Sequence, residues 1–154
     1  MGKFKSLGKG HEWERDVAKY LKEKTGVEFF RVPMSGAFST NTGAKSGQFL
    51  GDVFTEEKKY SDTCIECKSY KEMKITEFFN PNSKLFDWFA QAENESHDLD
   101  GWIVFFKINH LGMFMAYDTE YNTELIQELN AKHCGVKINI YDEEGTCYQL
   151  IKTN

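Results

Sequence analysis

Three charged residues of this 154-residue chain have types and a spacing that suit the cleavage of phosphodiester bonds. Asp52 is followed fourteen residues later by Glu66, and Lys68 comes two residues after Glu66. Side chains two residues apart on a strand point to the same face, so Glu66 and Lys68 would project together while Ile65 and Cys67 turn the other way. A hairpin turn between the two segments would return Asp52 to their side. Two carboxylates and one ammonium could then hold a divalent metal ion and orient a water molecule.

The same spacing also fits a solvated strand face with an ordinary cross-strand pair of Lys and Glu. Three features of the sequence favour a catalytic site over this alternative. The segment around Glu66 is otherwise apolar, and Gly51 before Asp52 would allow close backbone approach by a ligand. The stretch 35–47 is rich in Gly, Ser, Thr and Asn, which is typical of a loop that contacts a phosphate backbone.

A helix predicted over 11–24 supplies a further carboxylate. At about 100° per residue, the apolar positions of this helix centre between Val17 and Leu21. Glu14 lies nearest that direction, whereas Glu12 and Asp16 lie farther round the helix. We therefore expect Glu14 to reach the sheet and the other two acids to face solvent.

Hydrophobic periodicity and turn residues predict the remaining elements. We expect strands over 28–33, 49–54, 63–70, 101–106, 113–117, 136–141 and 146–151, and helices over 83–96 and 119–131. Lys9 and Gly10 are expected in a loop, Gly26 to end the first helix, and Asp118 or Thr119 to cap the last. The order predicts one domain over 1–154 with a mixed α/β fold, in which a central mixed sheet is flanked by helices. The aromatic residues expected in the core are Trp88, Trp102, Phe105 and Phe106.

The charge distribution leaves a nucleic-acid partner open despite a net charge of −5. Residues 1–88 carry 15 Lys and Arg against 13 Asp and Glu, whereas residues 89–154 carry 4 against 11. The N-terminal part can thus present a basic surface while the acidic part faces solvent or a protein partner. No apolar run is long enough to span a bilayer and no apolar signal region follows Met1, so we expect a cytoplasmic protein that does not bind membranes.

Four cysteines in a cytoplasmic protein are expected as free thiols. Cys64 and Cys67, joined by His133 and Cys134, could form a zinc site. Positions three apart on a strand face opposite ways, however, so buried packing is the favoured interpretation.

Four motifs follow one another along the chain: Lys9-Gly10 with Glu14-Arg15-Asp16, Phe30-Arg31-Val32-Pro33 with Ser35-Gly36, Gly51-Asp52-Val53, and Ile65-Glu66-Cys67-Lys68. Together they resemble the archaeal-type Holliday junction resolvases of the PD-(D/E)xK nuclease superfamily, which have the restriction-endonuclease-like fold. The resemblance covers about residues 9–107, and the motifs occur in the family's order. Gly51 stands where the family usually has proline, the loop before Asp52 is longer, and the α/β segment after Lys107 extends beyond a minimal resolvase. A viral or mobile-element enzyme would fit this divergent form.

The resemblance implies a role for each matching position. Asp52 and Glu66 would hold Mg²⁺ or Mn²⁺ together with the backbone carbonyl of Cys67, and Glu14 would support that metal site. Lys68 is the third signature residue. Ser35 and Arg31 match a serine and a basic residue near the scissile phosphate. Gln91 matches a helix position that some superfamily members use near the site, against the alternative of an ordinary exposed residue.

The implied reaction is metal-dependent hydrolysis of DNA at four-way junctions, and symmetric cutting implies a homodimer with two active sites. If the protein is viral, its location would be the host cytoplasm. A nuclease that nicks, cuts flaps or acts as a restriction enzyme, and a non-catalytic DNA-binding module, remain alternatives. The lysines that could contact phosphates, or could serve solubility alone, are Lys3, Lys5, Lys9, Lys45, Lys71 and Lys74.

Overall fold

The fold is built around one seven-stranded mixed sheet, seen in a computed structural model that describes residues 2–33 and 50–153. The strand order is β1-β2-β3-β4-β5-β7-β6. β3 and β4 are parallel, and the other neighbouring strands pair antiparallel. The predicted mixed α/β architecture is confirmed, and its C-terminal extension adds β7 and β6 to the edge beyond β5. The strands are β1 (Phe30–Arg31), β2 (Val53–Phe54), β3 (Thr63–Tyr70), β4 (Gly101–Ile108), β5 (Gly112–Asp118), β6 (Lys137–Tyr141) and β7 (Cys147–Lys152).

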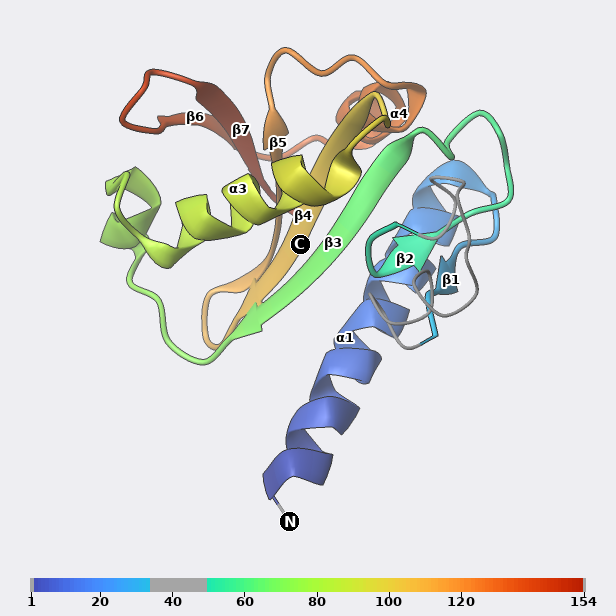
Figure 1. The fold of residues 1–154 in the computed structure, drawn as a ribbon, viewed down its shortest axis with the longest axis horizontal. Coiled ribbons are helices and arrows are strands. Elements are labelled where there is room, and N and C mark those ends of the chain that lie inside the picture. The colour runs from blue at the N-terminus through green and yellow to red at the C-terminus, as the bar shows by residue number, and fades with distance from the viewer. Residues whose placement is uncertain (1, 34–49, 154) are drawn as a thin grey trace.

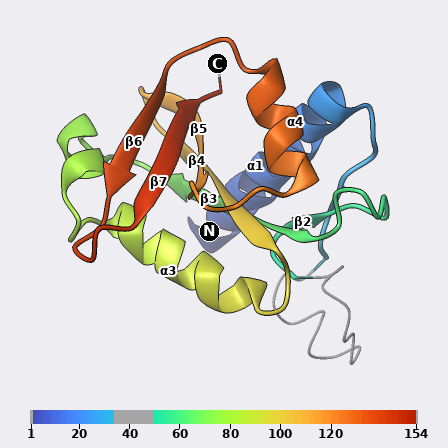
Figure 2. The ribbon, with the colours of Figure 1, turned by 90° about the horizontal axis from the view of Figure 1, so that it is seen from above.

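Helices cover both faces of the sheet (Figures 1 and 2). α1 (Gly2–Thr25) and α4 (Glu124–Lys132) pack on one face, around a core that includes Trp13, Ile103 and Leu125. α3 (Lys84–Ser96) and the short 3₁₀ helix η2 (Ile75–Phe79) pack on the other face. The central strand β4 is therefore buried from both sides, which explains its continuous apolar run.

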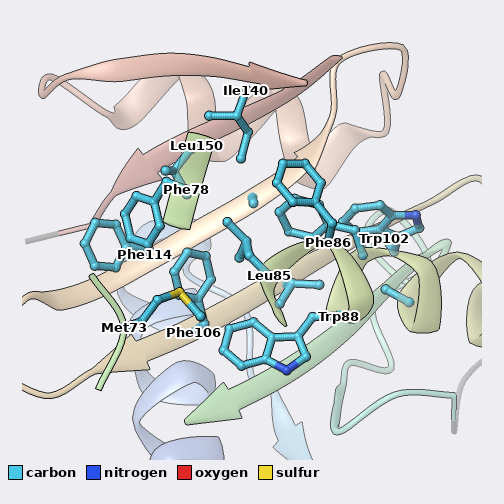
Figure 3. Close-up of a cluster of buried hydrophobic side chains, with 14 of the residues drawn as sticks. Met73, Phe78, Leu85, Phe86, Trp88, Trp102, Phe106, Phe114, Ile140 and Leu150 are labelled. Carbon is cyan, nitrogen blue, oxygen red and sulfur yellow. The ribbon is translucent and has the colours of Figure 1, made fainter. Parts of the chain in front are cut away.

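The core beneath α3 is dominated by aromatic rings (Figure 3). Phe106 and Phe114 stack with ring centroids 5.2 Å apart, and Phe78 meets Phe114 edge-on at 5.3 Å. Phe89 of α3 stacks on Trp102 of β4 at 5.5 Å. The predicted core aromatics are all buried, which confirms that expectation, and their packing holds α3 against the central strands.

The first helix is longer than predicted. Trp13, Val17 and Leu21 recur every four residues and are buried, and the helix ends at Gly26 as expected, where φ is +76° and the Gly26 N–H donates to the Lys22 carbonyl at 2.8 Å. The prediction of a loop at Lys9 and Gly10 is wrong, because the helix already begins at Gly2. A Cβ on Gly10 would meet open space, so nothing near this glycine obstructs a helical path.

The last helix begins later than predicted. Asp118 still pairs with Tyr148 in the sheet, and the Thr119 N–H donates to the Cys147 carbonyl at 3.0 Å, so neither residue is available as a helix cap. Thr123 caps α4 instead, and its side-chain oxygen accepts from the Ile126 N–H at 3.3 Å. The predicted strands 28–33 and 49–54 are likewise shortened to two residues each within the described residues.

Within 2–33 and 50–153, no helix combines the length and the apolar character needed to cross a membrane.

Candidate active site

β3 presents Glu66 and Lys68 on one face and Ile65 and Cys67 on the other, as the alternating sequence predicts. Ile65 and Cys67 belong to the core beneath α1, whereas Cys64 belongs to the core beneath α3. Glu66 and Lys68 share the parity of Cys64 and therefore face α3. The same alternation places Cys64 and Cys67 on different faces, which opposes a shared metal site. The four cysteines, including Cys134 and Cys147, are free thiols.

Asp52 is brought to β3 by the hairpin that the sequence predicts. β2 pairs with β3 at Val53↔Ile65, and the Asp52 N–H donates to the Ile65 carbonyl at 2.8 Å. The Asp52 carbonyl in turn accepts from the Val32 N–H at 2.8 Å. Both backbone groups of Asp52 are thus tied to neighbouring segments, so its side chain leaves the backbone in a defined direction.

The Asp52 carboxylate lies at the edge of β3 just beyond its last pairing with β2. Its Oδ2 accepts from the backbone N–H of Cys67 at 2.8 Å. The N–H and C=O of one strand residue point to the same edge, so the Cys67 carbonyl faces the side on which Asp52 sits. The arrangement places the three oxygen donors named by the sequence, from Asp52, Glu66 and the Cys67 carbonyl, along one short stretch of β3.

Gly51 is required by its close packing against β3. Its φ is +83°, and a Cβ at this position would lie 2.6 Å from the Ile65 carbonyl oxygen. The close neighbour of this glycine is therefore the strand itself, and the approach of a ligand here stays a prediction. Proline fixes φ near −65°, so the usual proline of the motif could not adopt this backbone.

Glu14 reaches the site from α1, as its position on the helix predicts. Its side chain is 13% exposed, and Arg31 Nη1 lies 3.6 Å from its Oε2. That oxygen is buried and has no hydrogen-bond partner among the described residues. Burial, followed by repulsion from Asp52, raises the pKa of Glu14 to about 7, while Arg31 acts in the opposite direction. Glu12 and Asp16 are exposed, also as expected.

Glu66 is a buried acidic residue, with only 3% of its surface exposed. Burial is the main reason that its pKa is raised well above the usual range, and a hydrogen bond with Glu95 and the charge of Asp52 add to the effect. The Cys64 thiol donates a weak hydrogen bond to Glu66 Oε1 at 3.7 Å. Burial of the Cys64 thiol and the charge of Glu66 raise the pKa of Cys64. Acidic groups crowded away from water favour a bound cation.

Lys68 is linked to α3 through two polar residues. Its Nζ donates to Gln91 Oε1 at 2.8 Å, and Gln91 Nε2 donates to Glu95 Oε1 at 3.0 Å. The resemblance already singled out Gln91, but Glu95 was missed. Its signal was present in the sequence, because Glu95 follows Gln91 by four residues and so lies on the same helix face.

The oxygen donors fit a hard divalent cation bound by few protein ligands. Among residues 2–33 and 50–153, no three His, Cys, Asp or Glu side chains form a ready-made metal cage. Mg²⁺ commonly keeps several waters and takes one or two carboxylates plus the oxygens of a phosphate substrate. Asp52, Glu66 and the Cys67 carbonyl match that pattern, whereas a structural zinc site would need four closed ligands.

The residues expected to contact DNA are only partly brought together. Arg31 lies beside Glu14, at the site. Lys71 and Lys74 are exposed just beyond β3, and Lys9 lies within α1. Ser35 and Lys45, like the predicted loop 35–47 that carries them, fall outside the described residues.

Comparison with known proteins gives this arrangement a family context. Protein D14 of Escherichia phage T5 is 36% identical over 97 residues, which are 62% of this chain and 59% of that protein. The chain thus matches about three fifths of the length of that relative. No solved structure matches the chain. The family described as "Phage putative PDDEXK endonuclease" matches residues 5–154. Because this match covers nearly the whole chain, the protein belongs to that family of phage PD-(D/E)xK endonucleases.

Proposed function

We propose that this protein is a metal-dependent endonuclease that hydrolyses phosphodiester bonds in DNA, with four-way junctions as its substrate. Membership of the phage endonuclease family supports nuclease activity. The observation that carries the proposal is the convergence of Glu14, Asp52 and Glu66, from three separate segments, on the strand that also holds Lys68. A solvated strand face would not bury one carboxyl group at 3% exposure beside two others.

Each residue has a distinct task in this proposal. Asp52, Glu66 and the Cys67 carbonyl hold Mg²⁺ or Mn²⁺, and Glu14 supports them from α1. The ion supplies a more acidic water molecule and charge stabilisation at the phosphate. Lys68 orients the attacking water through Nζ and stabilises negative charge that develops on the phosphate.

The remaining residues of the proposal bind the DNA backbone. Arg31 and Ser35 contact the phosphate at the scissile bond, and Lys9, Lys45 and Lys71 contact neighbouring phosphates. Such contacts fix the position of the DNA without reading its sequence, which suits an enzyme that recognises the shape of its substrate.

The junction substrate and the oligomeric state rest on the resemblance to the archaeal-type resolvases. Symmetric cleavage of a four-way junction needs two active sites at a fixed separation, so we include a homodimer with two-fold symmetry in the proposal. A phage enzyme of this kind would work in the host cytoplasm.

A cleavage assay with matched substrates tests the proposal. Purified protein is incubated with end-labelled four-way junctions and with linear, nicked and flapped duplexes of the same arm sequences, in Mg²⁺, in Mn²⁺ and in EDTA. We expect junction cleavage that needs the metal and is lost in Glu66→Ala and in Lys68→Ala, while junction binding in EDTA is retained. The variant Asp98→Asn, which alters an exposed carboxylate, controls for the loss of one charge.

Three results would contradict parts of the proposal. Absence of cleavage of every substrate in both metals contradicts nuclease activity. Full activity of either active-site variant contradicts the assigned site. Preference for a linear, nicked or flapped duplex over the junction is compatible with nuclease activity but contradicts the proposed junction substrate. The molar mass of the purified protein, measured by light scattering, distinguishes a dimer from a monomer.

A further inference from the structure

The side chain of Lys68 is held at the end of a chain of hydrogen bonds that begins on α3. Lys68 Nζ donates to Gln91 Oε1 at 2.8 Å, and Gln91 Nε2 donates to Glu95 Oε1 at 3.0 Å. Gln91 and Glu95 lie one helical turn apart, so both reach the same side of α3. The contact connects the lysine of the site to an element that contributes none of the carboxylates in the metal proposal.

The chemistry of the three groups fixes the direction of the chain. A lysine ammonium can only donate hydrogen bonds, an ionised carboxylate can only accept them, and an amide can do both. Gln91 placed between Lys68 and Glu95 must therefore turn its oxygen to the lysine and its nitrogen to the glutamate. A flipped amide would set two donors against each other at Lys68 and two acceptors against each other at Glu95. Glu95 thus determines which atom Gln91 presents to Lys68.

The helix that carries the pair is firmly docked on the sheet. Phe89 and Ala92, on either side of Gln91, are buried at 1% and 0% exposure. Phe89 stacks on Trp102, whose Nε1 donates to Glu93 Oε2 at 2.6 Å. Since α3 is anchored to β4 by these contacts and β4 pairs along the whole of β3, the distance between Gln91 and Lys68 is set by the core.

We propose that Gln91 and Glu95 are positioning residues for the nuclease reaction, and that Glu95 acts on Lys68 through the amide of Gln91. The proposal rests on the function proposed above, because it assumes that Lys68 Nζ works at the scissile phosphate. A long lysine side chain has many rotamers, and an acceptor at a fixed place selects the few that point Nζ at the reaction. The pair therefore raises kcat without contacting DNA.

A double-mutant cycle tests the dependence of one residue on the other. Glu95→Leu removes the acceptor at similar volume, and Gln91→Leu removes the connecting amide. We expect each single variant to lower kcat on the cleaved substrate about tenfold with little change in KM, because the placement of Nζ is lost. The double variant should lose less than the product of the two single losses, since Gln91 carries part of the effect of Glu95 to Lys68, beside the direct charge of Glu95 and its hydrogen bond with Glu66.

A polarity swap separates this role from loss of a structural contact. In Gln91→Glu/Glu95→Gln, the new carboxylate at 91 accepts from Lys68 and also from the new amide at 95, so both hydrogen bonds return with the same net charge. We expect kcat within about threefold of the wild-type value. Asp98→Leu, which removes an exposed carboxylate just beyond α3, is the matched control and should leave kcat and KM unchanged.

A second readout does not depend on activity. In the metal-free protein, one of the two protons of the Gln91 side-chain amide should have a chemical shift in the ¹H–¹⁵N spectrum that is changed by its hydrogen bond to Glu95. This change should disappear in Glu95→Leu, while thermal unfolding shows whether that variant remains folded.

The outcomes distinguish the two proposals. If the wild-type protein cleaves no substrate, the proposed function fails and the positioning role fails with it. If the wild-type protein cleaves DNA, the positioning role alone is overturned by full kcat in Glu95→Leu, by multiplied losses in the double variant, or by a swap variant as slow as Glu95→Leu. An amide signal that is unchanged in Glu95→Leu likewise overturns it.

Discussion

Replacing Glu14 by glutamine should stabilise the metal-free protein at alkaline pH. The Glu14 side chain is 13% exposed and lies near Asp52, with Arg31 as a partial counter-charge. Burial and the charge of Asp52 raise its pKa from 4.5 to about 7, which means that the fold favours the neutral carboxyl group. Glutamine has nearly the same shape and carries no charge, so it removes the penalty of ionisation.

The size of the effect follows from the difference between the folded and unfolded pKa. A shift of about 2.5 pKa units at roughly 1.36 kcal/mol per unit corresponds to about 3 kcal/mol as an upper value. The sign follows from proton binding. Between about pH 4.5 and 7 the folded wild-type protein holds a proton that the unfolded chain releases, so this contribution to stability is present below pH 4.5 and is lost as the pH rises through 7.

Urea unfolding measures this difference without adding salt that would screen the charges. The free energy of unfolding of both proteins is determined in EDTA at several values between pH 4 and 8.5. We expect the variant and the wild type to agree near pH 4 and to diverge steadily above it, reaching about 3 kcal/mol, or roughly 6 to 12 °C in Tm, by pH 8.

The exposed Glu12 provides a control on the same helix. Glu12→Gln should change the free energy of unfolding by less than about 0.5 kcal/mol at either end of the pH range. A Glu14→Gln protein less stable than the wild type at pH 8 would refute the reasoning, as would a gain of equal size at every pH.

The glycines and the thiols give three further predictions. Gly51→Ala should lower the free energy of unfolding by about 2 kcal/mol or more in urea, because its Cβ would lie 2.6 Å from the Ile65 carbonyl oxygen at a φ of +83°. Gly10→Ala, where a Cβ meets open space inside α1, should raise it by about 0.5–1 kcal/mol, and a loss at this position would contradict the helix. Dithionitrobenzoate should label the exposed Cys134 quickly and the buried Cys64 only after unfolding. Fast labelling that persists when Cys67, Cys134 and Cys147 are all replaced by Ser would contradict the burial of Cys64.

The features that sequence predicts well are those that depend on local periodicity. The two-residue period around Glu66 placed Ile65 and Cys67 on the face opposite Lys68, and the helical period placed Glu14 toward the sheet. Both follow from the direction in which neighbouring side chains leave one element. Neither requires knowledge of how the elements pack together.

The features that sequence did not predict depend on contacts between elements. Glu95 joins the site only because α3 docks across β3, which places its face opposite Lys68. The start of α4 shifted because β7 extends its pairing to Asp118, a partner thirty residues away along the chain. The packing of Gly51 against the β3 backbone also escapes the sequence, because the local residues do not reveal that neighbour.

The edge of β3 beyond Ile65 shows how strand pairing can be ended by a side chain. Backbone groups along an unpaired strand edge can recruit a strand from another chain. Here the carboxylate of Asp52 occupies the Cys67 N–H that an added strand would need. A helix or loop laid over this edge would also prevent strand addition, but it would exclude any large ligand. A side chain ends the ladder with a single carboxylate, so the residue proposed to bind metal also blocks further strand pairing at this point of the edge.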